Sequence, residues 1–223
     1  DYCKFNRQVL KMKNIPTIPS LSIFVVWLFH VSGIIGILMG AKDWFVQLTP
    51  LNLTVCFAVI LFNIQSMKPR DILVLMIPFF IGFFAEFSGV NYGLIFGDYR
   101  YGNNLGYQLY GVPIIIGINW VVLVYATSGI SKQISSNRIL SSFLASLLMV
   151  FLDFFMEKSA PYFDFWRFEN NEVPLQNYVG WFGVSFLCHL IFQPLFQKEN
   201  RPLSWNLYLV FLLFFVIFYF VHL

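Results

Sequence analysis

Residues 86–120 read EFSGVNYGLIFGDYRYGNNLGYQLYGVPIIIGINW. The stretch begins with Glu86 at the end of an apolar run, passes through a loop rich in glycine and tyrosine, and re-enters an apolar run at Val112 and Pro113. Residues 153–181 have the same form, with acids at the end of an apolar run, an aromatic loop, a proline and a new apolar run. We expect these two stretches to face each other and to form one site.

The composition determines the class of protein. Of the 223 residues, 58% are hydrophobic and 11% are charged. Because a soluble globular domain carries about 25% charged residues, this chain has too few charges to cover a surface that faces water. The composition therefore predicts an integral membrane protein.

Seven apolar runs are long enough to cross a hydrocarbon core of about 30 Å, which requires roughly 17–25 helical residues. The runs are continuous and do not alternate apolar with polar residues, so they predict helices rather than a β-barrel. We expect an all-α polytopic bundle of about seven transmembrane helices, forming a single domain over residues 20–223 after a basic cytoplasmic tail at residues 1–19. The expected spans are 20–40, 50–66, 71–87 (interrupted by Pro78), 112–128, 139–156, 176–196 and 203–223.

Lysine and arginine are distributed unevenly between the two sides of these spans. Loops rich in these residues stay in the cytoplasm. The N-terminal tail and every second loop carry most of them: Lys4, Arg7, Lys11, Lys13, Lys68, Arg70, Lys132, Arg138, Lys198 and Arg201. We therefore expect a cytoplasmic N-terminus and an external C-terminus, which places both stretches on the external side.

Three acids are candidate catalytic residues: Glu86, Asp153 and Glu157. An ionisable group at the centre of a membrane span costs about 2.5–3.5 kcal/mol. Asp153 and Glu157 are four residues apart, which puts them on one helix face. Burial and mutual repulsion favour the neutral form of one of them, and such a carboxylic acid can act as a general acid. Alternatively, these acids lie in water at the interface and pair with Lys158 or Arg100.

Aromatic side chains crowd the same side of the chain. They could form the aromatic belt of a membrane interface, or they could line a site for a long apolar ligand, where ring faces stabilise a carbocation. The candidate substrate-binding residues, which include one asparagine, are Tyr99, Tyr101, Trp120, Trp166, Asn177 and Trp181.

Motifs of several enzyme classes are missing from the sequence. There is no histidine cluster for a di-iron centre, no D-D-x-x-D motif for magnesium and diphosphate, and no lysine in the last span for a retinal Schiff base. Nucleophile elbows and nucleotide-binding glycine loops are also missing. Acids, aromatic rings and an apolar ligand remain, which suits acid-catalysed addition to an isoprenoid double bond without cofactor or metal.

Short motifs in the two stretches follow the order found in a known family. They are Glu86-x-x-Gly89, Gly97-x-Tyr99-x-Tyr101, Leu105-Gly106, Gly111-Val112-Pro113 and Trp120, then Leu152-Asp153, Trp166, Val173-Pro174, Asn177 and Gly180-Trp181. In these motifs the chain resembles the carotenoid biosynthesis membrane proteins of the CruF type, a family that includes hydratases of bacterioruberin precursors. The chain departs from the family pattern at residues 91–97, where the family tends to have T-G-x-P-F-G, and at Glu157-Lys158, where it tends to have an acid followed by proline.

The resemblance implies a membrane hydratase that adds water across the terminal double bond of an acyclic carotenoid. We expect Asp153 or Glu86 to protonate that bond, while the other holds water or stabilises the tertiary cation. Glu157 would set the protonation of its neighbour. Asn177, with Tyr99 or Tyr101, would position the water.

Two alternatives remain open. The chain could be a carotenoid cyclase that uses the same acid step, or a transporter or sensor of lipids or small molecules that performs no chemistry. The expected partners are the carotenoid substrate and the bilayer, without nucleic acid, and other enzymes of the carotenoid pathway are candidate partners. We expect an integral protein of the bacterial inner membrane.

Overall fold

A computed structural model describes residues 18–169 and 171–221 of the chain. The long elements are helices, and four short strands lie in the connections. The helices are α2 (Ile18–Leu38), α3 (Lys42–Gln47), α4 (Thr49–Asn63), α5 (Pro69–Tyr92), α6 (Ile114–Ile134), α7 (Arg138–Ser159), α8 (Leu175–Leu195) and α9 (Arg201–Val221). The strands are β1 (Tyr99–Tyr101), β2 (Gln108–Leu109), β3 (Val112–Pro113) and β4 (Trp166–Phe168).

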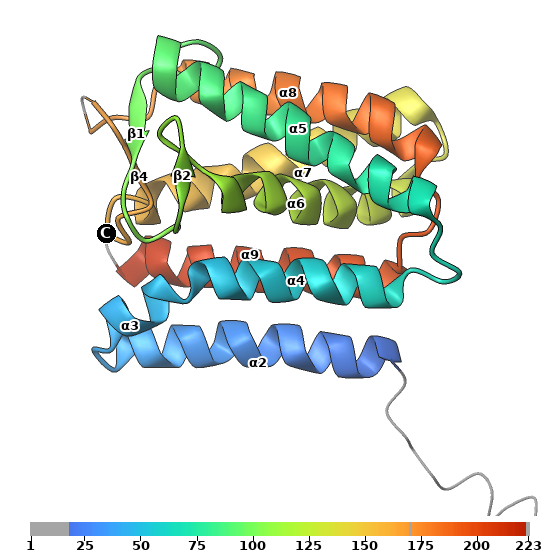
Figure 1. Cartoon of the computed structure of the whole chain (residues 1–223), viewed down its shortest axis with the longest axis horizontal. Coiled ribbons are helices and arrows are strands. Elements are labelled where there is room, and N and C mark those ends of the chain that lie inside the picture. The colour runs from blue at the N-terminus through green and yellow to red at the C-terminus, as the bar shows by residue number, and fades with distance from the viewer. Residues whose placement is uncertain (1–17, 170, 222–223) are drawn as a thin grey trace, which may run out of the picture.

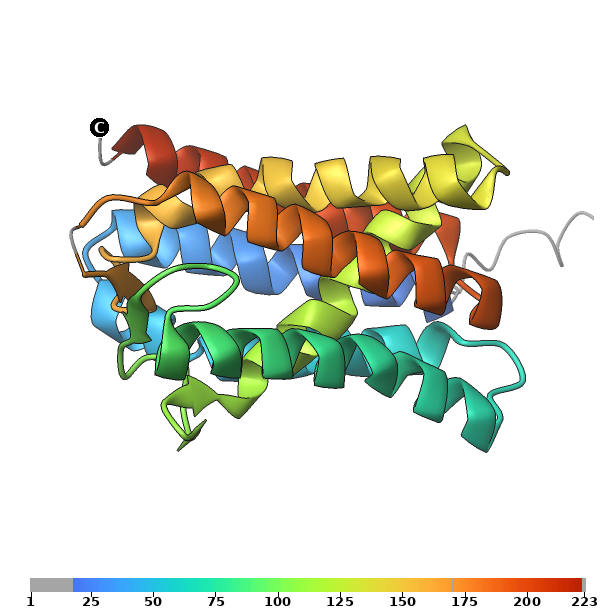
Figure 2. The ribbon, with the colours of Figure 1, turned by 90° about the horizontal axis from the view of Figure 1, so that it is seen from above.

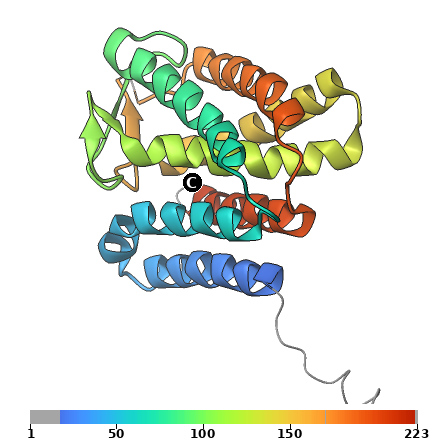
Figure 3. The ribbon, with the colours of Figure 1, turned by 45° about the vertical axis from the view of Figure 1, so that its right-hand side comes forward.

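The helices stack in layers around α6. Figure 1 shows α5 and α8 at the top, α6 and α7 below them, then α4 and α9, with α2 outermost. Figure 2 shows α6 crossing the other helices obliquely, and Figure 3 shows it between the upper and lower layers. Within the most apolar window of α6, 83% of the residues are buried, against 33–44% in the other long helices. The core of the protein is therefore built on α6.

The prediction of a polytopic helical membrane bundle is confirmed. Among the described residues, six helices are long and apolar enough to cross a membrane. The expected span at residues 50–66 is the exception, because α4 has 15 residues and a length of only about 22 Å. The expected tail at residues 1–19 lies almost entirely outside the described residues.

Proline and glycine define the ends of the helices that carry the site. Pro113 and Pro174 stand directly before α6 and α8, where the fixed φ of proline suits the start of a helix. Helix α5 ends at Tyr92 and is followed by Gly93, whose φ of 65° is the left-handed conformation that often follows a helix. Pro78 does not interrupt the third expected span, since α5 continues through it.

The two stretches that we expected to face each other are joined by β-pairing. Strand β1 pairs antiparallel with β4, with Tyr99 opposite Phe168 and Tyr101 opposite Trp166. Strands β2 and β3 form a second small pair. All four strands lie at one end of the bundle, whereas the connections α4–α5, α6–α7 and α8–α9 lie at the other end (Figure 1). One end of the molecule thus contains both loops.

Close packing of α5 on α6 depends on Gly82, and a substitution can test this. A Cβ atom at Gly82 would overlap the ring of Trp120, whereas a Cβ atom at Gly183, on the exposed face of α8, would meet nothing within 4 Å. We expect Gly82→Val to lower the free energy of unfolding by about 1–3 kcal/mol, as overpacking does. Thermal unfolding in detergent measures this effect, with Gly183→Val as the matched control. Equal midpoints for the two variants would contradict the packing described.

Candidate functional site

Glu86, near the end of α5, is the centre of one half of the site. Its side chain is 4% exposed and accepts three hydrogen bonds from neutral donors. The hydroxyl groups of Tyr99 and Tyr101 both donate to Oε2, the latter at 2.7 Å, and the indole N–H of Trp120 donates to Oε1 at 3.0 Å. Because alternate residues of a strand share a face, the spacing of the two tyrosines on β1 lets both reach one carboxylate oxygen.

Burial keeps the two tyrosines in their donating form. Burial, followed by the nearby negative charge of Glu86, raises the pKa of Tyr99 well above its ordinary value. The pKa of Tyr101 is raised well above its ordinary value for the same reasons. Both hydroxyl groups therefore keep their protons throughout the physiological pH range and donate to Glu86.

Asp153 and Glu157 form the other half of the site. They lie one turn apart on α7 and are 0% and 5% exposed. The side-chain nitrogen of Asn177, on α8, donates to Asp153 Oδ2 and to Glu157 Oε1, both at 2.9 Å. The indole N–H of Trp166, on β4, donates to Glu157 Oε2 at 2.9 Å. Asp153 Oδ1 is buried and has no hydrogen-bond partner in the described part of the chain.

Neutral groups, not cations, satisfy these acids. The ion pairs within residues 18–169 and 171–221 are Lys42–Asp43, Lys132–Glu199 and Lys198–Asp71. None of them includes Glu86, Asp153 or Glu157, so the alternative that these acids lie in water and pair with Lys158 or Arg100 is not supported. The described residues also contain no group of three His, Cys, Asp or Glu side chains that could hold a metal ion.

A small cavity of about 20 Å³ lies between the two halves. Glu86 and Glu157 both line it, and its volume suits a single water molecule. The other predicted residues in its wall are Tyr99, Tyr101, Trp166, Asn177 and Trp181. Trp120 and Asp153 stand behind this wall, since Trp120 stacks on Trp181 with ring centroids 4.7 Å apart and Asp153 is held by Asn177. Every residue predicted for the site therefore lies in one cluster.

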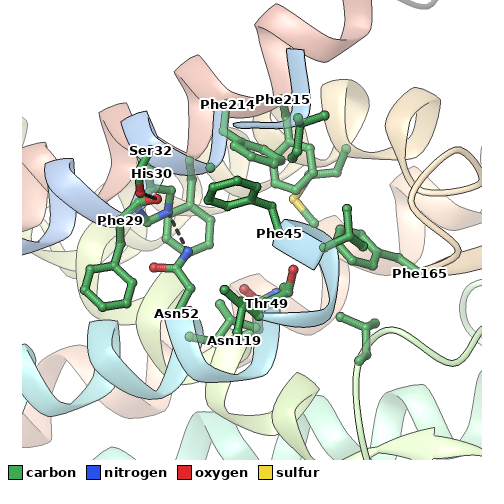
Figure 4. A pocket seen from close by; sticks show the side chains of 18 of the residues that line it. Phe29, His30, Ser32, Phe45, Thr49, Asn52, Asn119, Phe165, Phe214 and Phe215 are labelled. Atoms are coloured by element: carbon green, nitrogen blue, oxygen red, sulfur yellow. Dashed lines mark hydrogen bonds between the residues drawn. The ribbon is translucent and has the colours of Figure 1, made fainter. Parts of the chain in front are cut away.

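A larger cavity of about 320 Å³ adjoins the small one. It lies among α2, α3, α4 and α9, and its wall is mostly apolar (Figure 4). The few polar side chains in the wall include His30 and Asn52, whose side chains contact each other at 3.3 Å. At the rim, Leu28 and Trp44 are half exposed or more. The two cavities share four wall residues, Ile116, Asn119, Met156 and Trp166.

This larger cavity and the role of Asn119 in its wall were not predicted from the sequence. A lone asparagine within an apolar run, directly before a tryptophan that we had singled out, was the available signal, because polar groups in membrane spans tend to be functional. The cavity itself could not be predicted from the sequence, because its wall brings α2 and α3 together with α9, which lies more than 100 positions further along the chain.

A known protein family matches most of the chain. The family described as carotenoid biosynthesis protein matches residues 48–223. This chain belongs to that family. A relative of the chain is the bisanhydrobacterioruberin hydratase of Haloarcula japonica, which is 29% identical over 126 residues. The alignment covers 52% of this chain and 42% of the relative, so the chain spans less than half of the length of that protein. No solved structure matches the chain.

The role of Glu86 as an acceptor can be tested by stability measurements. Glu86→Leu leaves three buried donors without an acceptor, and each unsatisfied group costs about 1–3 kcal/mol. Glu86→Gln keeps one side-chain oxygen, so we expect its unfolding midpoint in detergent to lie between those of the wild type and of Glu86→Leu. Glu172→Leu, at an exposed loop acid, serves as the control. The described network would be wrong if Glu86→Leu unfolded like this control.

Proposed function

We propose that this chain is a carotenoid hydratase, which adds water across the terminal C=C bond of an acyclic carotenoid end group. One observation carries the proposal: two buried acids line a cavity of the size of one water, and that cavity shares a wall with a large apolar one. A hydration needs an acid, a water and an apolar pocket in contact. Membership of the carotenoid biosynthesis family and the name of the Haloarcula relative support this reading.

The Asp153–Glu157 pair is the proton source in this proposal. Two carboxylates one helical turn apart, without a cation beside them, repel each other, and sharing one proton relieves the repulsion. Glu157 lines the small cavity whereas Asp153 does not. Glu157 therefore delivers the proton, and Asp153 is the buried partner that shares it. This assignment differs from the sequence-based expectation, in which Asp153 or Glu86 was the acid.

The proposed reaction has two steps, protonation of the double bond and addition of water, followed by the return of a proton to the acid pair. The proton of Glu157 adds to the CH carbon of the terminal double bond, which leaves a positive charge on the neighbouring tertiary carbon. The oxygen of water then bonds to that carbon, and a proton of the water passes to Glu86. The faces of Trp166 and Trp181 stabilise the cation between these steps. A proton returned from Glu86 to the Asp153–Glu157 pair completes the cycle.

The larger cavity holds the end group of the substrate. Its volume of about 320 Å³ is in the range of sites for small organic ligands, so it accepts the end of a long polyene and not the whole molecule. The exposed rim at Leu28, Phe29 and Trp44 leaves the rest of the polyene in the lipid. The shared wall then brings the terminal double bond to Glu157.

The orientation in the membrane follows from the positive charges. We propose that the protein lies in the inner membrane of a bacterium, with the basic tail of residues 1–19 in the cytoplasm and the acid cluster toward the external side. Other enzymes of the carotenoid pathway are the candidate protein partners.

Expression in a lycopene-producing bacterium tests the activity. We expect carotenoids that have gained the mass of one water. Glu157→Gln, Asp153→Asn and Glu86→Gln should each lower the amount of product by about 10²–10⁴-fold, as the loss of acid–base catalysis does. Glu172→Gln, an exposed acid in the loop before α8, should keep wild-type activity. The protein in each membrane fraction is quantified in parallel.

Each other outcome of this expression test has a defined meaning. A product isomeric with the substrate would favour the cyclase. An unchanged polyene bound to the purified protein would favour a transporter or sensor. No gain of water, with the wild-type protein present in the membrane, would refute the hydratase.

The assignment of the larger cavity is tested at Gly33. This residue lines the cavity, and a Cβ atom added to it would meet only Phe214, at an ordinary 3.9 Å. We expect Gly33→Leu to fold normally, to fill part of the cavity and to raise KM by about tenfold or more, since about 1.4 kcal/mol of lost binding is a factor of ten. Gly183→Leu, on the exposed face of α8, is the matched control. An unchanged KM for Gly33→Leu would place the substrate elsewhere.

A further inference from the structure

Asn119 is a buried polar residue that the proposed reaction has not used. It lies on α6 and is 7% exposed. Its side-chain amide has no hydrogen-bond partner among the described residues, and it is not one of the fully buried unpaired groups, so it opens onto the cavities that it lines. Polar groups that are shielded from bulk water are usually hydrogen-bonded, and a cavity with polar groups in its wall can hold a water molecule that bonds to them. The amide of Asn119 is therefore free to bond to a polar molecule in these cavities.

The position of Asn119 indicates which molecule this is. Of the four residues that the two cavities share, Ile116 and Met156 are apolar, and the N–H of Trp166 already donates to Glu157. Asn119 therefore supplies the free hydrogen-bonding groups at the boundary between the water-sized cavity and the apolar one. Figure 4 shows it in the wall of the larger cavity, on the side of Thr49.

We propose that Asn119 is the positioning residue for the nucleophilic water, and that it directs the carbocation toward hydration. This inference rests on the proposed function. A water in a cavity of about 20 Å³ needs two to four polar partners. Glu86 on α5 and Asn119 on α6 both line this cavity and provide two such partners. The amide oxygen accepts one proton of the water, and Glu86 takes the other, so that a lone pair of the water oxygen faces the tertiary carbon.

The cation has a second fate when the water is not held. It can lose a proton to the carboxylate of Glu157. Loss from the carbon that was protonated regenerates the original alkene, and loss from another carbon attached to the tertiary centre gives a positional isomer. In D₂O the acid carries a deuteron, so this return leaves deuterium in the recovered alkene. The ratio of exchanged or isomerised alkene to alcohol thus reports on water placement, separately from proton donation.

The experiment measures this ratio in membranes that contain the full chain, in D₂O, with unlabelled lycopene added. We expect the wild type to give mainly alcohol. Asn119→Leu should raise the ratio of deuterated or isomerised alkene to alcohol by about tenfold, the effect of losing one good hydrogen bond. Asn119→Ser, whose hydroxyl group keeps a donor and an acceptor, should give an intermediate ratio.

The matched control is Asn63→Leu. Asn63 is also 7% exposed, but its amide is bonded to Ser22 and to the carbonyl of Val59, and it lines neither cavity. This variant should keep the wild-type ratio even if less protein accumulates. A ratio for Asn119→Leu equal to that of the control would overturn the proposal, as would the loss of both exchange and alcohol in folded Asn119→Leu.

Asn119→Ser keeps the proposal testable if the leucine variant does not fold. A wild-type ratio in Asn119→Ser at reduced turnover would assign Asn119 a purely structural role and overturn the proposal. If the wild type forms no alcohol, the hydratase assignment itself fails. Results from the Asn119 variants alone test only the role of Asn119 and not that assignment.

Discussion

The end of the bundle that carries the site is organised by the burial of three carboxyl groups without a cation. Each carboxyl oxygen of Glu86 and Glu157 accepts a hydrogen bond from a neutral donor, and Asp153 has one such oxygen. The donors come from β1, β4, α6 and α8. The pairing of β1 with β4 brings the donors of the two loops together. The hydrogen bonds to the acids therefore hold the two loops in place. The donors on these loops in turn offset the free-energy cost of burying the acids.

Neutral donors have a chemical consequence that salt bridges would not have. A lysine or arginine beside Glu157 would bind its anion strongly and hold it away from proton transfer. A cation would also repel the carbocation of the proposed reaction. Tyrosine, tryptophan and asparagine satisfy the oxygens without adding charge. The site thus remains suited to a reaction whose intermediate is positive.

Much of this architecture can be predicted from the sequence, because the length of an apolar run and the spacing of two acids are local properties. The runs at 71–87 and 176–196 correspond to α5 and α8 within a few residues. The span expected at 50–66 ends three residues earlier, because α4 stops at Asn63, whose amide bonds to Ser22. The pairing of β1 with β4 and the larger cavity depend on contacts between distant segments. A single sequence does not encode such contacts in a local pattern. The position of Asn119 between the two cavities depends on these contacts, so it could not be predicted.

The family match covers the whole wall of the small cavity but only part of the wall of the larger one. The match begins at residue 48, after α2 and α3, whereas every residue of the small cavity lies at position 86 or beyond. Helices α2 and α3 supply one wall of the larger cavity, including Phe29, Gly33 and Phe45. The three acids of the proposed reaction thus lie within the matched region, whereas α2 and α3, which cover the proposed position of the end group, lie outside it. On the proposed function, we expect a different end group to require changes in α2 and α3, with the acids unchanged.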